Sequence, residues 1–280
     1  MTDTTPTTPP HPARFSGPVL DQLMDLLHPE VHRIADREPG RGYVHVLDPF
    51  AGVGNVHRLA GPVRVGPEDD DTRTVLVSTV GVELEPEWAT AHPGTEQGDA
   101  TALRFDTGSF DVVATSPCYG NRMADHHEAR DTCKTCAGTG YDGEDSPLSP
   151  SCPSCKGAGL SKRNTYRHQL GRPLTPGSGA GLLWGPEYRA LHDAAIGEMV
   201  RVVREDGLVL VNMSNHLTDK GNTEHHVTEW WVNALLYRAC RIAGVYPVRT
   251  RRQRQGQNGQ HRTEHEFVIA VRTPRNRRLL

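Results

Sequence analysis

Two short segments, each directly after a β-branched run, constrain this chain more than any other feature. Asp48-Pro49-Phe50-Ala51-Gly52-Val53-Gly54 follows the run 43–47, and Thr115-Ser116-Pro117-Cys118-Tyr119-Gly120-Asn121-Arg122 follows the run 110–114. Such runs predict buried parallel strands, and open α/β sheets bind their ligands at the carboxyl ends of these strands. Both segments are therefore expected at the ligand-binding edge of one sheet.

The two segments differ in chemistry. Gly52 and Gly54 allow a ligand to approach the backbone before a helix, whose amino end favours an anionic group such as a carboxylate. The second segment offers the Ser116 hydroxyl and the Pro117 carbonyl, which can accept the two N–H groups of an amine. Tyr119 adds an aromatic face to this segment.

The remaining pattern alternates strands with helices. This alternation predicts an α/β fold, a Rossmann-like doubly wound sheet that ends in an antiparallel hairpin. The expected strands lie at 43–47, 75–82, just before 98, 110–114, 208–213, 245–250 and 266–272, and the expected helices begin after Ser16 and cover 187–203 and 227–243.

Three regions follow from composition. Residues 1–12 are rich in Thr and Pro and are expected to be disordered. Periodicity is lost over 123–185, which predicts an inserted module within a catalytic domain made of 13–122 and 186–280.

Charge and hydropathy restrict the function classes. The 280-residue chain has a formal net charge of −3, which excludes a globally basic nucleic-acid coat, so any nucleic-acid contact must be a local patch. No apolar run is long enough to cross a bilayer, and the N-terminus lacks a hydrophobic signal region. The sequence therefore predicts a soluble, cytoplasmic protein without a membrane partner.

The segments 48–54 and 115–119, together with His11-Pro12-Ala13-Arg14-Phe15-Ser16, resemble the S-adenosylmethionine-dependent DNA amino-methyltransferases. The resemblance implies the methyltransferase form of the Rossmann-like sheet, S-adenosylmethionine as cofactor and double-stranded DNA as partner. Ser116, where Asp or Asn is also used, favours cytosine N4 over adenine N6 as the methylated atom. The recognised site, and whether a restriction nuclease is a partner, are left open.

The same resemblance implies a set of cofactor contacts. Glu83, at the end of the second strand, suits the ribose hydroxyls, with Glu85 as a competing candidate, and Asp99 is expected at the adenine amino group. Phe15 is expected near the methionine end, or as an anchor for the first helix. The full set is Phe15, Ser16, Asp48, Pro49, Phe50, Gly52, Gly54, Glu83, Asp99 and Ala100.

The catalytic set is Ser116, Pro117, Cys118 and Tyr119, and it departs from the family at one position. Cys118 stands where family members usually have a second proline. This departure leaves open carbon-5 cytosine methylation, in which a Pro-Cys thiolate attacks the ring. A non-catalytic nucleic-acid-binding module is the alternative from a different functional class.

The predicted insertion contains two copies of CxxCxGxG. Their thiols, Cys133, Cys136, Cys152 and Cys155, predict one closed structural Zn²⁺ site, and the repeats resemble those of J-domain chaperones. Basic residues that can neutralise phosphates lie beside the catalytic segment, after the cysteines and near the last strand. They are Arg122, Lys162, Arg163, Arg251, Arg252 and Arg254.

Overall fold

The computed structural model describes most of the chain. The described residues are 8–11, 15–66, 72–120, 131–143, 149–161, 166–218, 223–250 and 263–276. Within these ranges, no helix combines the length and the apolar character that a membrane span requires.

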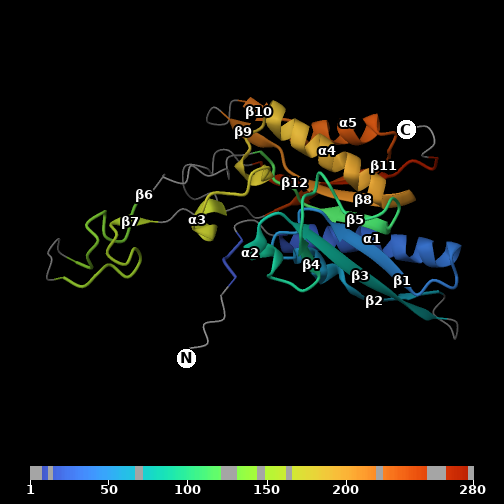
Figure 1. Cartoon of the computed structure of the whole chain (residues 1–280), viewed down its shortest axis with the longest axis horizontal. Helices are drawn as coiled ribbons and strands as arrows, with labels where there is room; N and C mark the ends of the chain where they lie inside the picture. The colour runs from blue at the N-terminus through green and yellow to red at the C-terminus, as the bar shows by residue number, and fades with distance from the viewer. Residues whose placement is uncertain are drawn as a thin grey trace.

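One large mixed sheet forms the centre of the molecule (Figure 1). Its strand order is β11-β12-β8-β5-β1-β3-β2, and β4 pairs with β3 beside this path. The strands β4, β3, β1, β5 and β8 run parallel, whereas β12 is antiparallel to both β8 and β11. This topology confirms the expected Rossmann-like methyltransferase sheet with its antiparallel terminal hairpin.

Apart from β2, the sheet strands lie close to their expected positions. They are β1 Tyr43–Asp48, β2 Gly61–Val65, β3 Arg73–Glu83, β4 Thr95–Gln97, β5 Phe110–Thr115, β8 Val203–Met213, β11 Arg241–Arg249 and β12 His265–Arg272. The helices are α1 Gly17–Arg37, α2 Pro86–Ala89, α3 Tyr166–Leu170, α4 Pro186–Val202 and α5 Val227–Tyr237, with 3₁₀ turns η1 Asn55–Leu59 and η2 Gly179–Gly181. Two small pairs complete the described part: β6 Asp131–Thr132 with β7 Leu160–Ser161, and β9 His216–Thr218 with β10 Thr223–His225.

Helices cover both faces of the sheet, as Figure 1 shows. Alternate side chains of the buried strands enter two separate cores: Val112 and Ala114 pack in the core that contains α1, and Val113 packs in the core of α4 and α5. Because strand side chains point to opposite faces in turn, a strand between two helical layers is buried on both faces and is largely apolar. This explains why β5 is buried along its whole length.

Three details differ from the sequence expectation. The last helix ends at Tyr237 instead of 243, since Ala239 adopts a left-handed conformation at φ 56° and β11 begins at Arg241. The glycine turn opens only the five-residue η1, followed by β2, which sequence patterning did not predict. The expectation that an α-helix follows the glycine turn is therefore wrong, and a turn this short supplies no long helix dipole.

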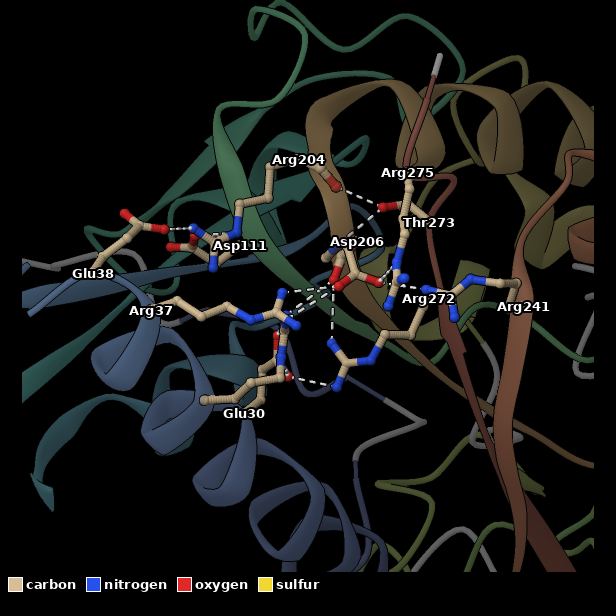
Figure 2. Close-up of polar contacts among 12 residues, drawn as sticks. Glu30, Arg37, Glu38, Asp111, Arg204, Asp206, Arg241, Arg272, Thr273 and Arg275 are labelled. Atoms are coloured by element: carbon tan, nitrogen blue, oxygen red, sulfur yellow. Dashed lines mark hydrogen bonds and ion pairs between the residues drawn. The ribbon is translucent and has the colours of Figure 1, made fainter. Parts of the chain in front are cut away.

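An arginine-rich network ties α1 to the terminal hairpin at the amino ends of the parallel strands (Figure 2). Asp206 near the start of β8 pairs with Arg37 of α1 at 2.9 Å and with Arg241 of β11. Glu30 of α1 pairs with Arg272 of β12 at 2.7 Å. The network holds the sheet edge that lies opposite the catalytic segment.

The region predicted as an insertion, 123–185, contains two parts that make different contacts. The cysteine-containing hairpin around β6 and β7 extends away from the sheet in Figure 1. In contrast, Tyr166 and Ala180 pack with Trp88 of α2, and Arg172 pairs with Glu85 at 2.7 Å. Tyr166, Arg172 and Ala180 therefore pack against the region of the central sheet.

Candidate functional site

The glycine turn after β1 is fixed by Asp48. One Asp48 oxygen accepts hydrogen bonds from the Phe50 amide at 3.0 Å and from the Thr115 hydroxyl at 2.6 Å. Thr115 begins the second segment, so this carboxyl joins the two segments directly. Burial raises the pKa of Asp48 to about 7, against the lowering effect of the hydrogen bonds from Thr115 and Phe50.

Gly52 and Gly54 have the left-handed conformations that the turn requires, at φ 55° and 82°. A Cβ on Gly54 would lie 2.7 Å from the His57 ring, which leaves no room for a larger residue. Gly52 lies beneath the His11 ring, and His11 packs edge-on against Trp88 with ring centroids 4.5 Å apart. Residues 8–11, which were expected to be disordered, therefore reach the glycine turn.

The predicted acidic residues lie at neighbouring strand ends. Glu83, the last residue of β3, accepts a hydrogen bond from the Gly52 amide at 2.8 Å, and burial raises its pKa to about 7. Asp99 lies two residues beyond β4, is exposed, and accepts hydrogen bonds from the Thr101 amide and hydroxyl, both at 2.8 Å. Ala100 beside it is buried. The competing Glu85 is buried and bound to Arg172 and Thr175, so it anchors a loop.

The two N-terminal candidates have structural contacts. Ser16 is the N-cap of α1, and its hydroxyl accepts from the Val19 amide at 3.4 Å. Phe15 is partly buried against the core that contains α1. These contacts agree with the alternative in which Phe15 anchors the first helix. Pro49 is buried, and Phe50 stacks on His192 with ring centroids 5.6 Å apart.

The catalytic segment after β5 forms one hydrogen-bonded cluster. The Ser116 and Tyr119 hydroxyls lie 3.0 Å apart. The Asn212 amide nitrogen of β8 lies 3.2 Å from Ser116 Oγ, 2.7 Å from the Tyr119 oxygen and 2.7 Å from Glu266 Oε2 of β12. The Tyr119 hydroxyl also lies 3.2 Å from Glu266 Oε2. Three strands thus bring four polar groups together.

The direction of each hydrogen bond in this cluster follows from its members. A carboxylate only accepts and an amide nitrogen only donates, so the Tyr119 hydroxyl donates to Glu266. Ser116 must then donate its own proton to the Tyr119 oxygen. A lone pair of Ser116 Oγ remains as an acceptor at the half-buried surface of the site.

Helix α4 holds the other side of the segment. Tyr188 donates a 2.7 Å hydrogen bond to the Cys118 carbonyl, and the Trp184 amide donates to the Gly120 carbonyl at 3.0 Å. Pro117, directly before Cys118, is buried. These bonds fix the backbone at Cys118 although the second proline of the family is missing.

A small apolar cluster connects the glycine turn to the catalytic segment. Val53 of the turn and Cys118 pack with Trp88 and Tyr166. The Cys118 thiol donates to the Tyr166 oxygen at 3.8 Å, and burial raises the pKa of Cys118 to about 12. Cys118 is therefore held as a neutral thiol and is poorly suited to act as a thiolate nucleophile.

The four predicted zinc ligands converge. Their sulfur atoms all lie within 4.8 Å of one another, with Cys133 and Cys152 4.0 Å apart and Cys136 and Cys155 3.7 Å apart. Tetrahedral Zn–S bonds of about 2.3 Å place neighbouring sulfurs about 3.8 Å apart. The donor set and its spacing therefore fit a closed zinc site.

The predicted DNA-binding residues are not tested by the structure. All of them fall outside the described ranges: Arg122, Lys162, Arg163, Arg251, Arg252 and Arg254.

Sequence reasoning missed Asn212 and Glu266. Asn212 interrupts the apolar strand Val209-Leu-Val-Asn-Met213, and this interruption was a usable signal for a functional polar group. Glu266 begins an apolar strand, where a charged residue is ordinary, so nothing local distinguishes it.

No protein-family model matches this chain, and no curated protein matches its sequence. Its fold is similar to that of an S-adenosylmethionine-dependent methyltransferase from Methanosarcina mazei, at TM-score 0.41 and 10% identity, covering 84% of this chain and 95% of that one.

Two further solved structures match at the same level. Geranyl diphosphate methyltransferase in complex with sinefungin has TM-score 0.43 and 10% identity, covering 91% of this chain and 77% of that one. The [4+2]-cyclase SpnF has TM-score 0.43 and 12% identity, covering 95% and 85%. Similarity this low assigns no substrate and no reaction to this chain.

Proposed function

We propose that this protein is an S-adenosylmethionine-dependent DNA methyltransferase that transfers a methyl group to the exocyclic amine of a flipped base, with cytosine N4 as the favoured atom. The observation that carries the proposal is the Asp48–Thr115 hydrogen bond of 2.6 Å. It joins a glycine turn suited to the cofactor with a segment suited to an amine at one edge of the sheet.

On the cofactor side, the Gly52 amide donates to Glu83 at 2.8 Å, and the Gly98 amide beside Asp99 donates to the Glu83 carbonyl at 3.0 Å. Gly52, Glu83 and Asp99 come from the ends of β1, β3 and the strand that follows it. The Glu83 carboxylate can accept from a ribose diol, and exposed Asp99 can accept from the adenine amino group. S-adenosylmethionine would supply an electrophilic methyl group at this edge.

The amine side supports nitrogen as the acceptor. The nitrogen lone pair of an exocyclic amine is delocalised into the ring, which makes the nitrogen a poor nucleophile. Ser116 Oγ retains an acceptor lone pair, and such an acceptor holds an N–H group and orients the nitrogen toward tetrahedral geometry. Positioning of this kind supplies much of a transfer rate.

Carbon-5 methylation is disfavoured by the chemistry of Cys118. That reaction needs a thiolate, and the pKa of about 12 keeps Cys118 protonated near neutral pH. Adenine N6 remains the alternative amine, because the Ser116 acceptor does not distinguish the two bases.

We also propose that the cysteine hairpin binds one structural Zn²⁺ and contributes to DNA recognition. The four sulfurs leave no ligand position for a substrate.

Outside the hairpin, Arg251, Arg252 and Arg254 would neutralise DNA phosphates in a protein of net charge −3.

The test is incubation of the purified protein with isotopically labelled S-adenosylmethionine and unmodified double-stranded DNA, followed by nucleoside mass spectrometry. N4-methylcytosine is the expected product, and Ser116→Ala should yield none. N6-methyladenine would revise the base, and 5-methylcytosine would revise the mechanism. Cofactor binding without any labelled nucleoside would contradict a DNA substrate, and absence of cofactor binding would contradict the methyltransferase assignment.

A further inference from the structure

Glu266 and Asn212 lie beside the catalytic segment but belong to neither motif. Glu266 Oε2 lies 3.2 Å from the Tyr119 hydroxyl, which lies 3.0 Å from Ser116 Oγ. A continuous hydrogen-bonded path therefore runs from the group that faces the amine to a carboxylate at the start of β12. Glu266 is half-buried, so its end of the path can exchange a proton with solvent.

We infer that Glu266 is the terminal proton acceptor of a Ser116–Tyr119–Glu266 relay that removes the proton from the methylated amine. The inference rests on the proposed function and adds to it the destination of the proton. It also assigns Asn212 as the residue that positions the relay.

The hydrogen-bond directions suit this role. Tyr119 donates to Glu266 and Ser116 donates to Tyr119, so each proton already points along the path toward the carboxylate. Ser116 Oγ receives a hydrogen bond from the substrate amine. As the new bond forms, positive charge develops on the nitrogen, and an acceptor linked to a carboxylate stabilises that charge.

The step balances in atoms and electrons. The nitrogen lone pair forms the N–C bond, and the electron pair of the broken S–C bond remains on sulfur. The nitrogen then transfers one proton to Ser116 Oγ while the Ser116 proton moves to the Tyr119 oxygen and the Tyr119 proton moves to Glu266. The neutral Glu266 carboxyl finally returns its proton to water.

The Asn212 amide nitrogen lies within hydrogen-bond distance of all three oxygens of the relay, and its two hydrogens are nearest to the Tyr119 and Glu266 oxygens. The Asn212 side chain is buried, and its Oδ1 has no hydrogen-bond partner within the described part of the chain. A buried acceptor without a hydrogen-bond partner lowers the stability of the folded protein. An asparagine kept at this position at that cost is consistent with a role for its nitrogen, which lies 2.7 Å from both Tyr119 and Glu266.

The first experiment needs no turnover. A tyrosine that donates to a carboxylate absorbs at longer wavelength, so Glu266→Gln should shift the ultraviolet difference spectrum of the protein to the blue. The same change made in a Tyr119→Phe background should give no shift. A Glu266→Gln spectrum identical to the wild type would contradict the Tyr119–Glu266 contact and with it the relay.

The second experiment measures single-turnover methyl transfer to DNA. Glu266→Gln should lower the rate about 100-fold, the usual scale for losing a proton acceptor, with unchanged affinity for S-adenosylmethionine. Formate should restore part of the rate in Glu266→Ala but not in Glu266→Ala combined with Tyr119→Phe, which lacks the intermediate hydroxyl. Glu264→Gln, two residues away and exposed, is the matched control and should transfer normally.

The outcomes separate the two proposals. An active wild type with a fully active Glu266→Gln variant overturns the relay and leaves the proposed function intact. A Glu266→Ala variant that formate fails to rescue, although it folds and binds cofactor, also overturns the relay. A folded wild type that transfers no methyl group to DNA overturns the proposed function, and the relay falls with it.

Discussion

The Asp48 carboxyl and the Thr115 hydroxyl lie 2.6 Å apart across the ends of β1 and β5, and both side chains are buried. This bond unites the glycine turn with the catalytic segment. We expect Thr115→Val, which keeps the side-chain shape, to lower the free energy of unfolding by about 1–3 kcal/mol, because Asp48 loses a buried donor. Urea denaturation measures this loss.

Thr101→Val is the matched control for Thr115→Val. It removes a 2.8 Å hydroxyl–carboxylate bond to exposed Asp99, where water can replace the donor. The two variants should therefore differ clearly in stability. Equal midpoints with an unchanged denaturant slope would show that the Asp48–Thr115 bond does not hold the two segments together.

Glu83→Gln should weaken binding of S-adenosylmethionine, since a neutral amide accepts less strongly from the ribose hydroxyls than a carboxylate does. Burial raises the pKa of Glu83 to about 7, so the carboxylate is lost as the pH falls below that value. Wild-type affinity should accordingly be greater at pH 8 than at pH 6, and Glu83→Gln should reduce this dependence. Isothermal titration calorimetry measures both, with Glu96→Gln as the control.

Cys118 distinguishes the two cytosine chemistries. Cys118→Ala should retain methyl transfer, because a thiol with a pKa of about 12 is not the nucleophile, and Cys118→Pro restores the usual family motif. Ser116→Ala should lose transfer, since the amine is no longer held. Nucleoside analysis of treated DNA measures each variant. If both cysteine variants fold, bind cofactor and are inactive, the amino-methyltransferase assignment is wrong.

Metal analysis of protein purified without chelator should find one zinc per chain. Cys133→Ser should abolish it, whereas Cys240→Ser, a buried cysteine outside the cluster, should retain it. Cofactor binding should survive Cys133→Ser, because the cysteine hairpin does not form part of the sheet. Zinc retained in Cys133→Ser would contradict the four-cysteine site.

Neutralising Arg251, Arg252 and Arg254 to Gln should reduce the salt dependence of DNA affinity. Each lost phosphate contact lowers the slope of log affinity against log salt by roughly one. Fluorescence anisotropy over a range of NaCl concentrations measures that slope. An unchanged slope in the triple variant would assign these arginines to a solvated loop.

The sequence by itself determined the fold class, the two segments and the four cysteines that cluster. The strand at 110–114 carries the adjacent valines Val112 and Val113, and a strand covered on both faces is largely apolar, so local composition is enough to identify it although Asp111 interrupts the run. Cys133, Cys136, Cys152 and Cys155 were equally readable, because ligand spacing in a CxxC knuckle is a local property.

Only the tertiary structure decided how the site is completed. Asn212 and Glu266 lie 96 and 147 residues from their partners Ser116 and Tyr119, and sheet pairing alone brings β5, β8 and β12 into contact. The structure also decided between Glu83 and Glu85 as the candidate for the ribose contact, because Glu85 binds Arg172 and Thr175, which are distant in the sequence. The raised pKa of Cys118 also depends on the tertiary structure. Burial of the thiol results from packing of the whole chain, and the residues next to Cys118 in the sequence do not determine it.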